Sequence, residues 1–303
     1  MRQLRTGTLL ALAFAGARLA SAADVAVLKS ADTPAWRPAI DALRRAAASH
    51  TVTEYDLKGD RAEADRVVGS LKGKPGLLVA VGELAAQAAH EVAPELPLVF
   101  CMVKDPAKLG LMGQANVTGV QFSIPIKNQL AAFRLVNPRG VRIGVIYSDA
   151  NTGRQVDEAV KAAGVVRLNI VPKPVASEKD VPEALRALLK GADAIDALWI
   201  PPDPILLGDE SRRYILAETL KAAKPIYSFS AALVNEGALV SNGPDVTSIG
   251  DQVGELVSRV AGGEKGKIEM LIPRAELVVN KKIADKLKIE IPADALRAAN
   301  KVL

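Results

Sequence analysis

The feature that most constrains the fold is a regular alternation of short apolar runs with amphipathic helical patterns, which occurs twice along the chain. This alternation is typical of βαβ units and therefore of a parallel sheet. An uninterrupted apolar run such as LLVAV, at 77–81, suits a strand that helices cover on both faces. In the first series we expect a helix from about residue 36 to 47 and strands at 24–28, 51–57, 77–81 and 98–103.

A second series of the same kind begins after residues 138–140 (PRG). It predicts a second parallel sheet, with helices on both faces. Its helices are expected at 152–163, where Gly164 ends the pattern, at 183–189 and at about 211–223. Its strands are expected at 141–147, 168–171, 197–200 and 225–227.

The chain continues after this second sheet is complete. A strand-like run at 238–241 leads into an amphipathic helix near 249–260, and a second strand-like run follows at 268–272. This indicates that the chain returns to the first lobe before it ends on the second. We therefore predict an α/β fold of two doubly wound parallel-sheet lobes, joined by a hinge of several crossings that closes a cleft. The N-lobe would hold 23–122 plus about 242–272, and the C-lobe 123–241 plus about 273–303.

The first 22 residues are expected to be a cleavable signal peptide rather than part of the fold. Arg2 and Arg5 precede an apolar run at 8–17, and Ala20 and Ala22 are the small residues that a cleavage site after Ala22 requires. A membrane-spanning helix needs about 20 apolar residues, and Arg18 interrupts this run too early. The mature protein should therefore be soluble.

The number and position of cysteines indicate the cellular compartment in which the protein is expected. The single cysteine, Cys101, lies in an apolar run far from the cleavage site, so a lipid-anchored N-terminus and an internal disulfide are both excluded. We expect a soluble periplasmic protein, and a monomer. Removal of Arg2, Arg5 and Arg18 lowers the formal charge from +5 to +2, and the other basic residues are interspersed with acidic ones. This pattern argues against a nucleic-acid partner.

Signatures of catalysis and of cofactor binding are absent from the sequence. The two histidines, His50 and His90, lie 40 positions apart without a companion at metal-ligand spacing. There is no phosphate loop, no dinucleotide-binding Gly-x-Gly-x-x-Gly after the first strand and no Gly-x-Ser-x-Gly elbow. We therefore expect neither an enzyme, nor a cofactor, nor a metal.

In open α/β sheets, ligands bind beyond the carboxyl ends of the strands, where helix N-termini point free N–H groups into the crevice. This rule selects the loops after the strands expected at 77–81, 141–147, 197–200 and 225–227. The candidate ligand-binding residues in these loops are Gly82, Glu83, Asn151, Thr152, Asp203, Ser228 and Ser230.

Several of these candidates have a structural alternative. Asn151 or Thr152 is either a helix N-cap or a donor to an anionic group of the ligand, and Asp203, beside two prolines, is either a turn former or a ligand contact. Glu83 is either a partner for a ligand ammonium or a first-turn acid that favours the helix dipole. The aromatic residues Trp36 and Phe229 are assigned to core packing rather than to stacking on a ligand ring.

The C-terminal segment resembles a known family. Residues 276–284 (ELVVNKKIA) and 287–292 (LKIEIP) closely resemble the ending of the ABC-transporter substrate-binding family whose better known members bind tryptophan and related amino acids. Other matching pieces occur in the same order, so that the resemblance covers nearly all of the mature chain. These pieces are 97–100 (PLVF) with 105–106 (DP), 116–120 (NVTGV), 142–147 (RIGVIY) and 197–203 (ALWIPPD).

The resemblance implies a type I periplasmic-binding fold with three interlobe crossings and a small polar or aromatic metabolite as ligand. It also implies delivery of the ligand to an inner-membrane ABC permease. The alternative function is a ligand-sensing module that docks on a membrane histidine kinase or chemoreceptor. The family tends to carry acidic residues where this chain has 228–232 (SFSAA), and often has a Thr-Asn-Gly-Thr-like turn where this chain has 81–84 (VGEL). The first difference weighs against an amino-acid ligand, unless Glu83 substitutes for the missing acid.

Overall fold

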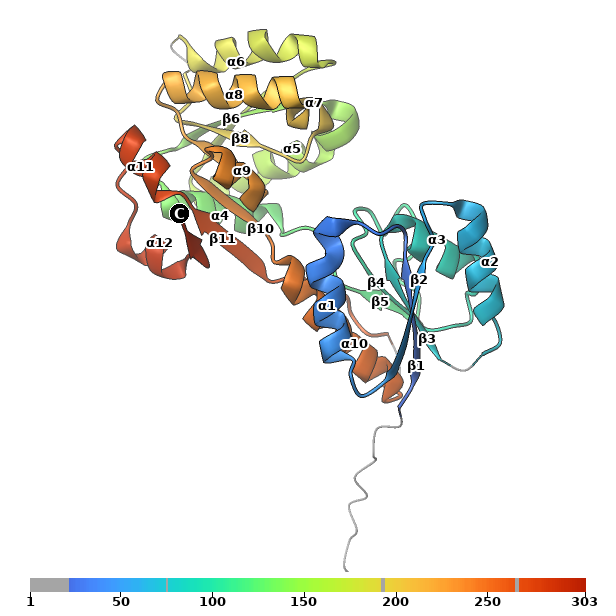
Figure 1. The fold of residues 1–303 in the computed structure, drawn as a ribbon. Coiled ribbons are helices and arrows are strands. Elements are labelled where there is room, and N and C mark those ends of the chain that lie inside the picture. The colour runs from blue at the N-terminus through green and yellow to red at the C-terminus, as the bar shows by residue number, and fades with distance from the viewer. Residues whose placement is uncertain (1–21, 75, 192–193, 265–266) are drawn as a thin grey trace, which may run out of the picture.

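The computed structural model describes residues 22–74, 76–191, 194–264 and 267–303 as two lobes, each built on its own sheet (Figure 1). The predicted signal peptide lies outside these described residues except for Ala22. None of the helices in the described ranges is both long and apolar enough to cross a membrane.

The N-lobe sheet is fully parallel, with the strand order β2-β1-β3-β4-β5. Its strands are β1 Asp24–Lys29, β2 Thr51–Asp56, β3 Leu77–Val81, β4 Leu98–Cys101 and β5 Val117–Gly119. Its helices are α1 Arg37–Ala46, preceded by the 3-10 turn Pro34–Trp36, α2 Arg61–Leu71, α3 Glu83–Val92 and α10 Val246–Ala261.

Alternation along β3 shows why its sequence is apolar throughout. Leu77, Val79 and Val81 point into the core beneath α1 and α10, whereas Leu78 and Ala80 point into the core beneath α2 and α3. The two helical layers therefore cover opposite faces of the sheet, as a continuous apolar strand predicts.

The C-lobe sheet has seven strands in the order β12-β11-β10-β9-β8-β6-β7. All neighbours are parallel except β10 and β11, which run antiparallel. The strands are β6 Arg142–Tyr147, β7 Asn169–Pro174, β8 Ala197–Ile200, β9 Ile226–Ser228, β10 Val240–Pro244, β11 Ala275–Val279 and β12 Lys301–Val302.

Helices cover both faces of this second sheet. One face packs against α4 Ile126–Val136, α5 Asp149–Ala163, α11 Lys281–Leu287 and α12 Ala293–Ala298. The other face packs against α6 Val181–Leu189, α7 Pro204–Leu207, α8 Asp209–Lys221 and α9 Ala231–Glu236. Short 3-10 turns lie at Gly164–Val166 and Glu178–Asp180. The α/β class with two doubly wound lobes is thus confirmed.

The chain passes between the lobes after β5, after β10 and before β11, so that α10 lies beside α1 in the N-lobe (Figure 1). These crossing segments are hydrogen-bonded to one another. Gln121 N donates to Leu271 O (2.9 Å), and Asp245 N donates to Arg274 O (2.8 Å). The prediction of a strand at 268–272 is wrong, because this run makes only an isolated bridge, between Leu271 and Val120.

Candidate functional site

The strand order of each sheet has a switch point at the carboxyl ends of two particular strands, and these two places are called here the N-lobe crevice and the C-lobe crevice. In the N-lobe the chain runs from β1 to α1 on one face of the sheet and from β3 to α3 on the opposite face. In the C-lobe, β6 and β8 are related in the same way through α5 and α7. Ligands of open α/β sheets bind at such points. Ser30 and Gly82 follow the two N-lobe strands, and Ser148 and 201–203 follow the two C-lobe strands.

The C-lobe crevice is organised by the buried carboxylate of Asp203, which is 0% exposed. Its Oδ2 accepts hydrogen bonds from Ser148 N (2.7 Å), Ser148 Oγ (2.9 Å) and Thr152 Oγ1 (2.6 Å). Its Oδ1 accepts from Ile205 N (3.0 Å), so that it also caps α7. Because protein groups use both oxygens, Asp203 ties the start of α5 to the end of β8. These hydrogen bonds show that Asp203 has an architectural role, which fits the turn-forming alternative, and its contact with a ligand stays a prediction.

The helix α5 begins three residues earlier than the sequence pattern indicated. Its N-cap position is Ser148, so that Asn151 and Thr152 lie inside its first turn and neither is the N-cap. Thr152 is buried and donates to Asp203. Asn151 is exposed, and its Nδ2 donates to Ser148 Oγ at 2.7 Å. Of the two, Asn151 is the residue that a ligand can reach.

Carboxylates gather at this edge of the C-lobe. Burial raises the pKa of the Tyr147 hydroxyl, and the nearby carboxylates of Asp149 and Asp157 raise it further. Asp149 is exposed in the first turn of α5, directly after the loop that Asp203 holds. Asp149 and the buried Asp203 therefore bring two carboxylates to this edge, where Arg154 of the same helix also lies.

Ser228 and Ser230, beyond β9, mainly serve their own turn. Ser228 is fully buried, and its Oγ accepts from Ser230 N at 3.0 Å. Ser230 is partly exposed and caps α9, since its Oγ accepts from Ala232 N at 3.2 Å. Phe229 between them is partly buried and packs on the core beneath α9.

The N-lobe crevice combines a glycine, a hydroxyl and an aromatic ring. Gly82, the N-cap of α3, has φ +96°. A Cβ atom at this position would lie 2.6 Å from Ser30 Oγ and 2.8 Å from the Trp36 ring, so both groups press against the glycine backbone. Trp36 is only partly buried, so its ring belongs to both the core and the crevice.

Ser30 is a further candidate site residue, which no sequence pattern indicated. It follows β1 directly and is 8% exposed. Its Oγ accepts from Ala85 N at 3.0 Å, and its hydroxyl donates to no other described residue. The first amides of α3, at Glu83 and Leu84, lie nearby without helical partners. The only available signal was the position of Ser30 at the carboxyl end of β1.

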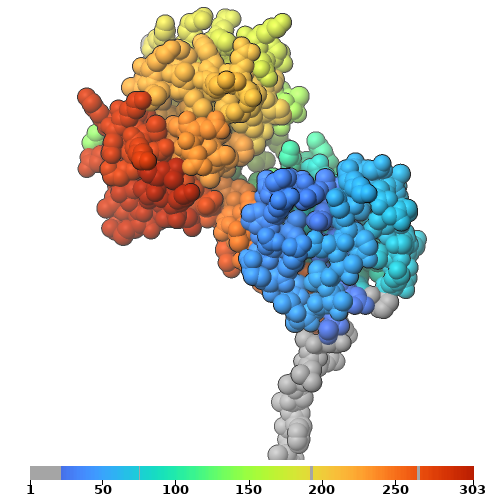
Figure 2. Space-filling model, viewed as in Figure 1, coloured from blue at the N-terminus to red at the C-terminus, as the bar shows by residue number. Residues whose placement is uncertain are grey.

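Glu83 shapes the neighbouring loop. It is exposed in the first turn of α3, and its Oε1 accepts from Lys104 N at 3.3 Å. The next residue, Asp105, reaches the other lobe, where its Oδ2 lies 3.5 Å from Arg154 Nη2 on α5. The carboxyl edges of the two sheets therefore face each other, and Figure 2 shows the surface hollowed between the lobes.

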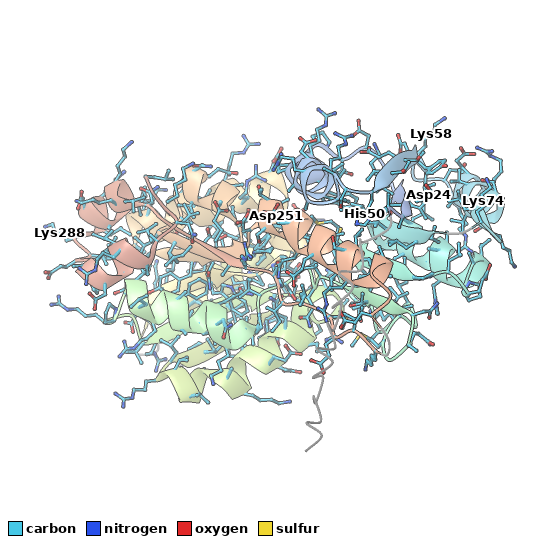
Figure 3. The ribbon with its side chains drawn as sticks, turned by 90° about the horizontal axis from the view of Figure 1, so that it is seen from below. Asp24, His50, Lys58, Lys74, Asp251 and Lys288 are labelled. Atoms are coloured by element: carbon cyan, nitrogen blue, oxygen red, sulfur yellow. The ribbon has the colours of Figure 1, made fainter. Side chains whose placement is uncertain are left out.

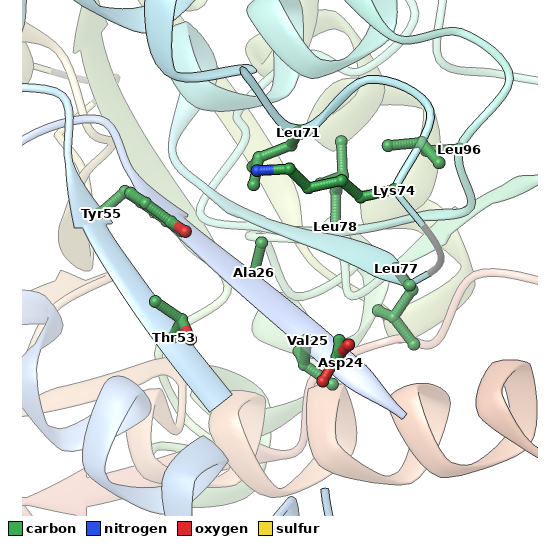
Figure 4. Close-up of a pocket in the computed structure, with 11 residues that line it drawn as sticks. Asp24, Val25, Ala26, Thr53, Tyr55, Leu71, Lys74, Leu77, Leu78 and Leu96 are labelled. Carbon is green, nitrogen blue, oxygen red and sulfur yellow. The ribbon is translucent and has the colours of Figure 1, made fainter. Parts of the chain in front are cut away.

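Two further pockets lie away from these edges. A pocket of about 300 Å³ in the N-lobe lies at the amino ends of β1 and β3, with Asp24 and Lys74 beside an apolar lining that includes Leu71, Leu78 and Leu96 (Figure 4). A pocket of about 470 Å³ in the C-lobe lies where the chain enters β6 and β9. Both lie at strand amino ends, opposite to the edge where such sheets bind ligands.

The described residues contain no cluster of three or more histidine, cysteine or acidic side chains that is suited to a metal. His50 Nδ1 accepts from Ala23 N at 3.2 Å, close to the start of β1. Burial raises the pKa of the Cys101 thiol to about 12, so this thiol is not poised as a nucleophile.

Comparison with known proteins gives a family-level match. A family model described as ABC transporter substrate binding protein matches residues 26–303. A tyrosine-binding protein of Clostridioides difficile (strain R20291) is 27% identical over 235 residues, which is 74% of this chain. The match spans 66% of that relative, just under two thirds of its length.

Two solved structures show the same fold. An ABC domain in complex with L-Trp from Streptococcus pneumoniae is 24% identical, with a TM-score of 0.66, over 93% of this chain and 100% of that one. The ligand-free, open structure of a substrate binding protein with adhesive properties from Clostridium difficile is 19% identical, with a TM-score of 0.81. It covers 93% of this chain and 99% of that one.

Proposed function

The chain belongs to the family of ABC transporter substrate binding proteins, and from this we propose that it captures a small aromatic, amino-acid-like solute between its lobes in the periplasm. It then delivers this solute to an inner-membrane ABC permease and does no chemistry on it. The proposal of a periplasmic location is supported by the predicted signal peptide and by the single, buried cysteine.

The observation that best supports an aromatic ligand is the position of the Trp36 ring, which lies against Gly82 and Ser30 at the N-lobe crevice. A partly exposed indole, fixed in place by backbone contact, offers a flat apolar surface to a second ring. The relatives named for tyrosine and found with L-Trp support the same ligand class.

The charges at the two edges favour one orientation of the ligand. The C-lobe edge holds Asp149 and the buried Asp203, so we propose that an ammonium group faces this side. The carboxylate then faces the N-lobe, where the Ser30 hydroxyl and the first amides of α3 are available. This reverses the orientation that a carboxylate anchor at Asn151 would give.

Binding of L-tyrosine and L-tryptophan, measured by calorimetry on the mature protein, tests the proposal. We expect Trp36→Ala to weaken binding by about 2 kcal/mol, roughly 30-fold, because a stacking aromatic anchor is lost. Tyr214→Ala is the matched control, since Tyr214 is also a partly buried aromatic residue but lies on α8, among residues beneath the far face of the C-lobe. Equal affinities of the two variants would refute the assignment.

Orientation is tested separately with two analogues of the ligand. An aromatic amine without the carboxylate should lose the contribution of Ser30, so that Ser30→Ala no longer changes its affinity. An aromatic acid without the amine should still respond to Ser30→Ala. The opposite pattern would place the carboxylate at the C-lobe.

We also propose that the lobes reorient about the three crossings when the ligand binds. Two separately cored sheets, joined by a few hydrogen-bonded segments, bend most easily between them. The higher TM-score with the ligand-free, open structure than with the L-Trp complex supports an open arrangement here. Small-angle scattering should show a smaller radius of gyration with ligand, and an unchanged radius would argue for a preformed site.

A further inference from the structure

A single ion pair between described residues joins the two lobes. Arg154 Nη2, on α5 of the C-lobe, lies 3.5 Å from Asp105 Oδ2, in the loop after β4 of the N-lobe. The other ion pairs between described residues each join groups of one lobe. This contact lies outside the three crossing segments and is therefore a separate connection between the lobes.

The backbone segment that carries each partner is held in place by its own lobe. Asp105 Oδ1 accepts from Lys108 N at 3.3 Å, which leaves Oδ2 to face the C-lobe. The loop that carries Asp105 is held by the Glu83 carboxylate, through Lys104 N. Arg154 stands near the start of α5, the helix that the Asp203 network fixes. The ion pair therefore links two backbone segments that the residues of the two crevices hold in place.

The geometry of the pair indicates how it behaves during closure. Its N–O distance of 3.5 Å is longer than the roughly 2.7–2.9 Å of a tight charge-assisted hydrogen bond. The Arg154 side chain is 76% exposed, whereas that of Asp105 is 21% exposed. A contact that already exists between separated lobes can shorten and lose water as the lobes approach, and it then strengthens because screening falls.

We infer that Asp105 and Arg154 are positioning residues for ligand capture, whose ion pair guides the lobes and tightens on closure. This inference rests on the proposed binding function. In the open protein the pair restrains the relative orientation of the lobes. In the closed protein it contributes more than in the open one, so that it favours the ligand-bound state.

The first test measures affinity for L-tyrosine and L-tryptophan by calorimetry. Asp105→Asn and Arg154→Gln should each weaken binding about 2- to 5-fold, the range for a partly exposed ion pair. The exchange of charges, Asp105→Arg with Arg154→Asp, should restore most of the loss. Arg259→Gln is the control, because it breaks an ion pair with Glu264 inside the N-lobe and should leave affinity unchanged.

The second test needs no ligand. Dyes on Lys74→Cys and Lys288→Cys, which lie on different lobes (Figure 3), report interlobe distance by single-molecule energy transfer. Cys101 is buried and stays unlabelled. Asp105→Asn should broaden the distribution of transfer efficiency in the ligand-free protein. Added salt screens the ion pair, so it should broaden the distribution of transfer efficiency of the unaltered protein toward the same width.

Unchanged or tighter binding by both single variants would overturn the inference, as would a charge exchange that restores nothing. Equal widths of the energy-transfer distributions of the unaltered protein and of Asp105→Asn, both without ligand, would also overturn the inference. If the unaltered protein binds neither amino acid, the proposed ligand class fails, and the ligand-free measurement still decides whether the pair restrains the lobes. Unfolding midpoints of all variants should stay close together, which separates positioning from loss of fold.

Discussion

Replacement of Asp203 by alanine should destabilise the C-lobe far more than loss of an ordinary helix cap. The carboxylate is 0% exposed and accepts four hydrogen bonds, from two backbone amides and two hydroxyls. The hydroxyls of Ser148 and Thr152 can turn toward other acceptors, but the amides of Ser148 and Ile205 cannot. Each buried donor without a partner costs about 1–3 kcal/mol, so we expect a loss of about 4 kcal/mol in the free energy of unfolding.

Asp245→Ala is the matched control for this variant. Asp245 caps α10 through Thr247 N (3.0 Å) and Ser248 N (3.2 Å), but it is partly exposed, so that water can replace it. We expect a loss of about 1 kcal/mol, as for a typical N-cap. Urea unfolding followed by circular dichroism, with m-values compared, measures both. Equal losses in the two variants would refute the architectural role of Asp203.

Three further predictions follow from single sites. Gly82→Ala should lower the free energy of unfolding by about 1–3 kcal/mol in urea melts, because φ is +96° and the new methyl group meets the indole ring described above. Cys101 should resist thiol reagents at pH 8 until the protein unfolds, because burial raises its pKa to about 12. Burial raises the pKa of Glu54, but hydrogen bonds from Arg44 and Lys29 outweigh this and lower it. Glu54→Gln should therefore destabilise at pH 7 and have little effect once the pH falls below the lowered folded-state value.

Long apolar strands were the most predictable part of the fold. The strands at 77–81 and 197–200 have the predicted bounds, because both faces of each are covered and the apolar run coincides with the strand. The family resemblance carried by 276–292 is confirmed by the family match, which extends to residue 303. The run at 268–272 has a similar composition, but it lies on a crossing segment where only one bridge forms.

The candidate site was less predictable, because its contacts are distant in sequence. Asp203 meets Ser148 and Thr152 across 55 and 51 positions, and no local pattern signals such a partnership. Asn151 and Thr152 are good N-cap residue types, yet Ser148 takes that position and the helix starts earlier. The helical spacing of Trp36 predicts core packing, which its contact with the N-lobe core confirms, but spacing does not show that its side chain also stays partly exposed beside Gly82.

The close packing of α10 on α1 has a consequence for the order in which the lobes are completed. Gly250 and Gly254 let the helices meet at backbone distance, since a Cβ on Gly250 would overlap the carbonyl oxygen of Ala39. Ile249, Val253, Leu256 and Val257 belong to the half of the N-lobe core that lies beneath α1 and α10. That half stays open to water until residues 246–261 arrive, after most of the C-lobe has been synthesised. The lobe that begins first therefore cannot complete its core until residues 246–261 join it.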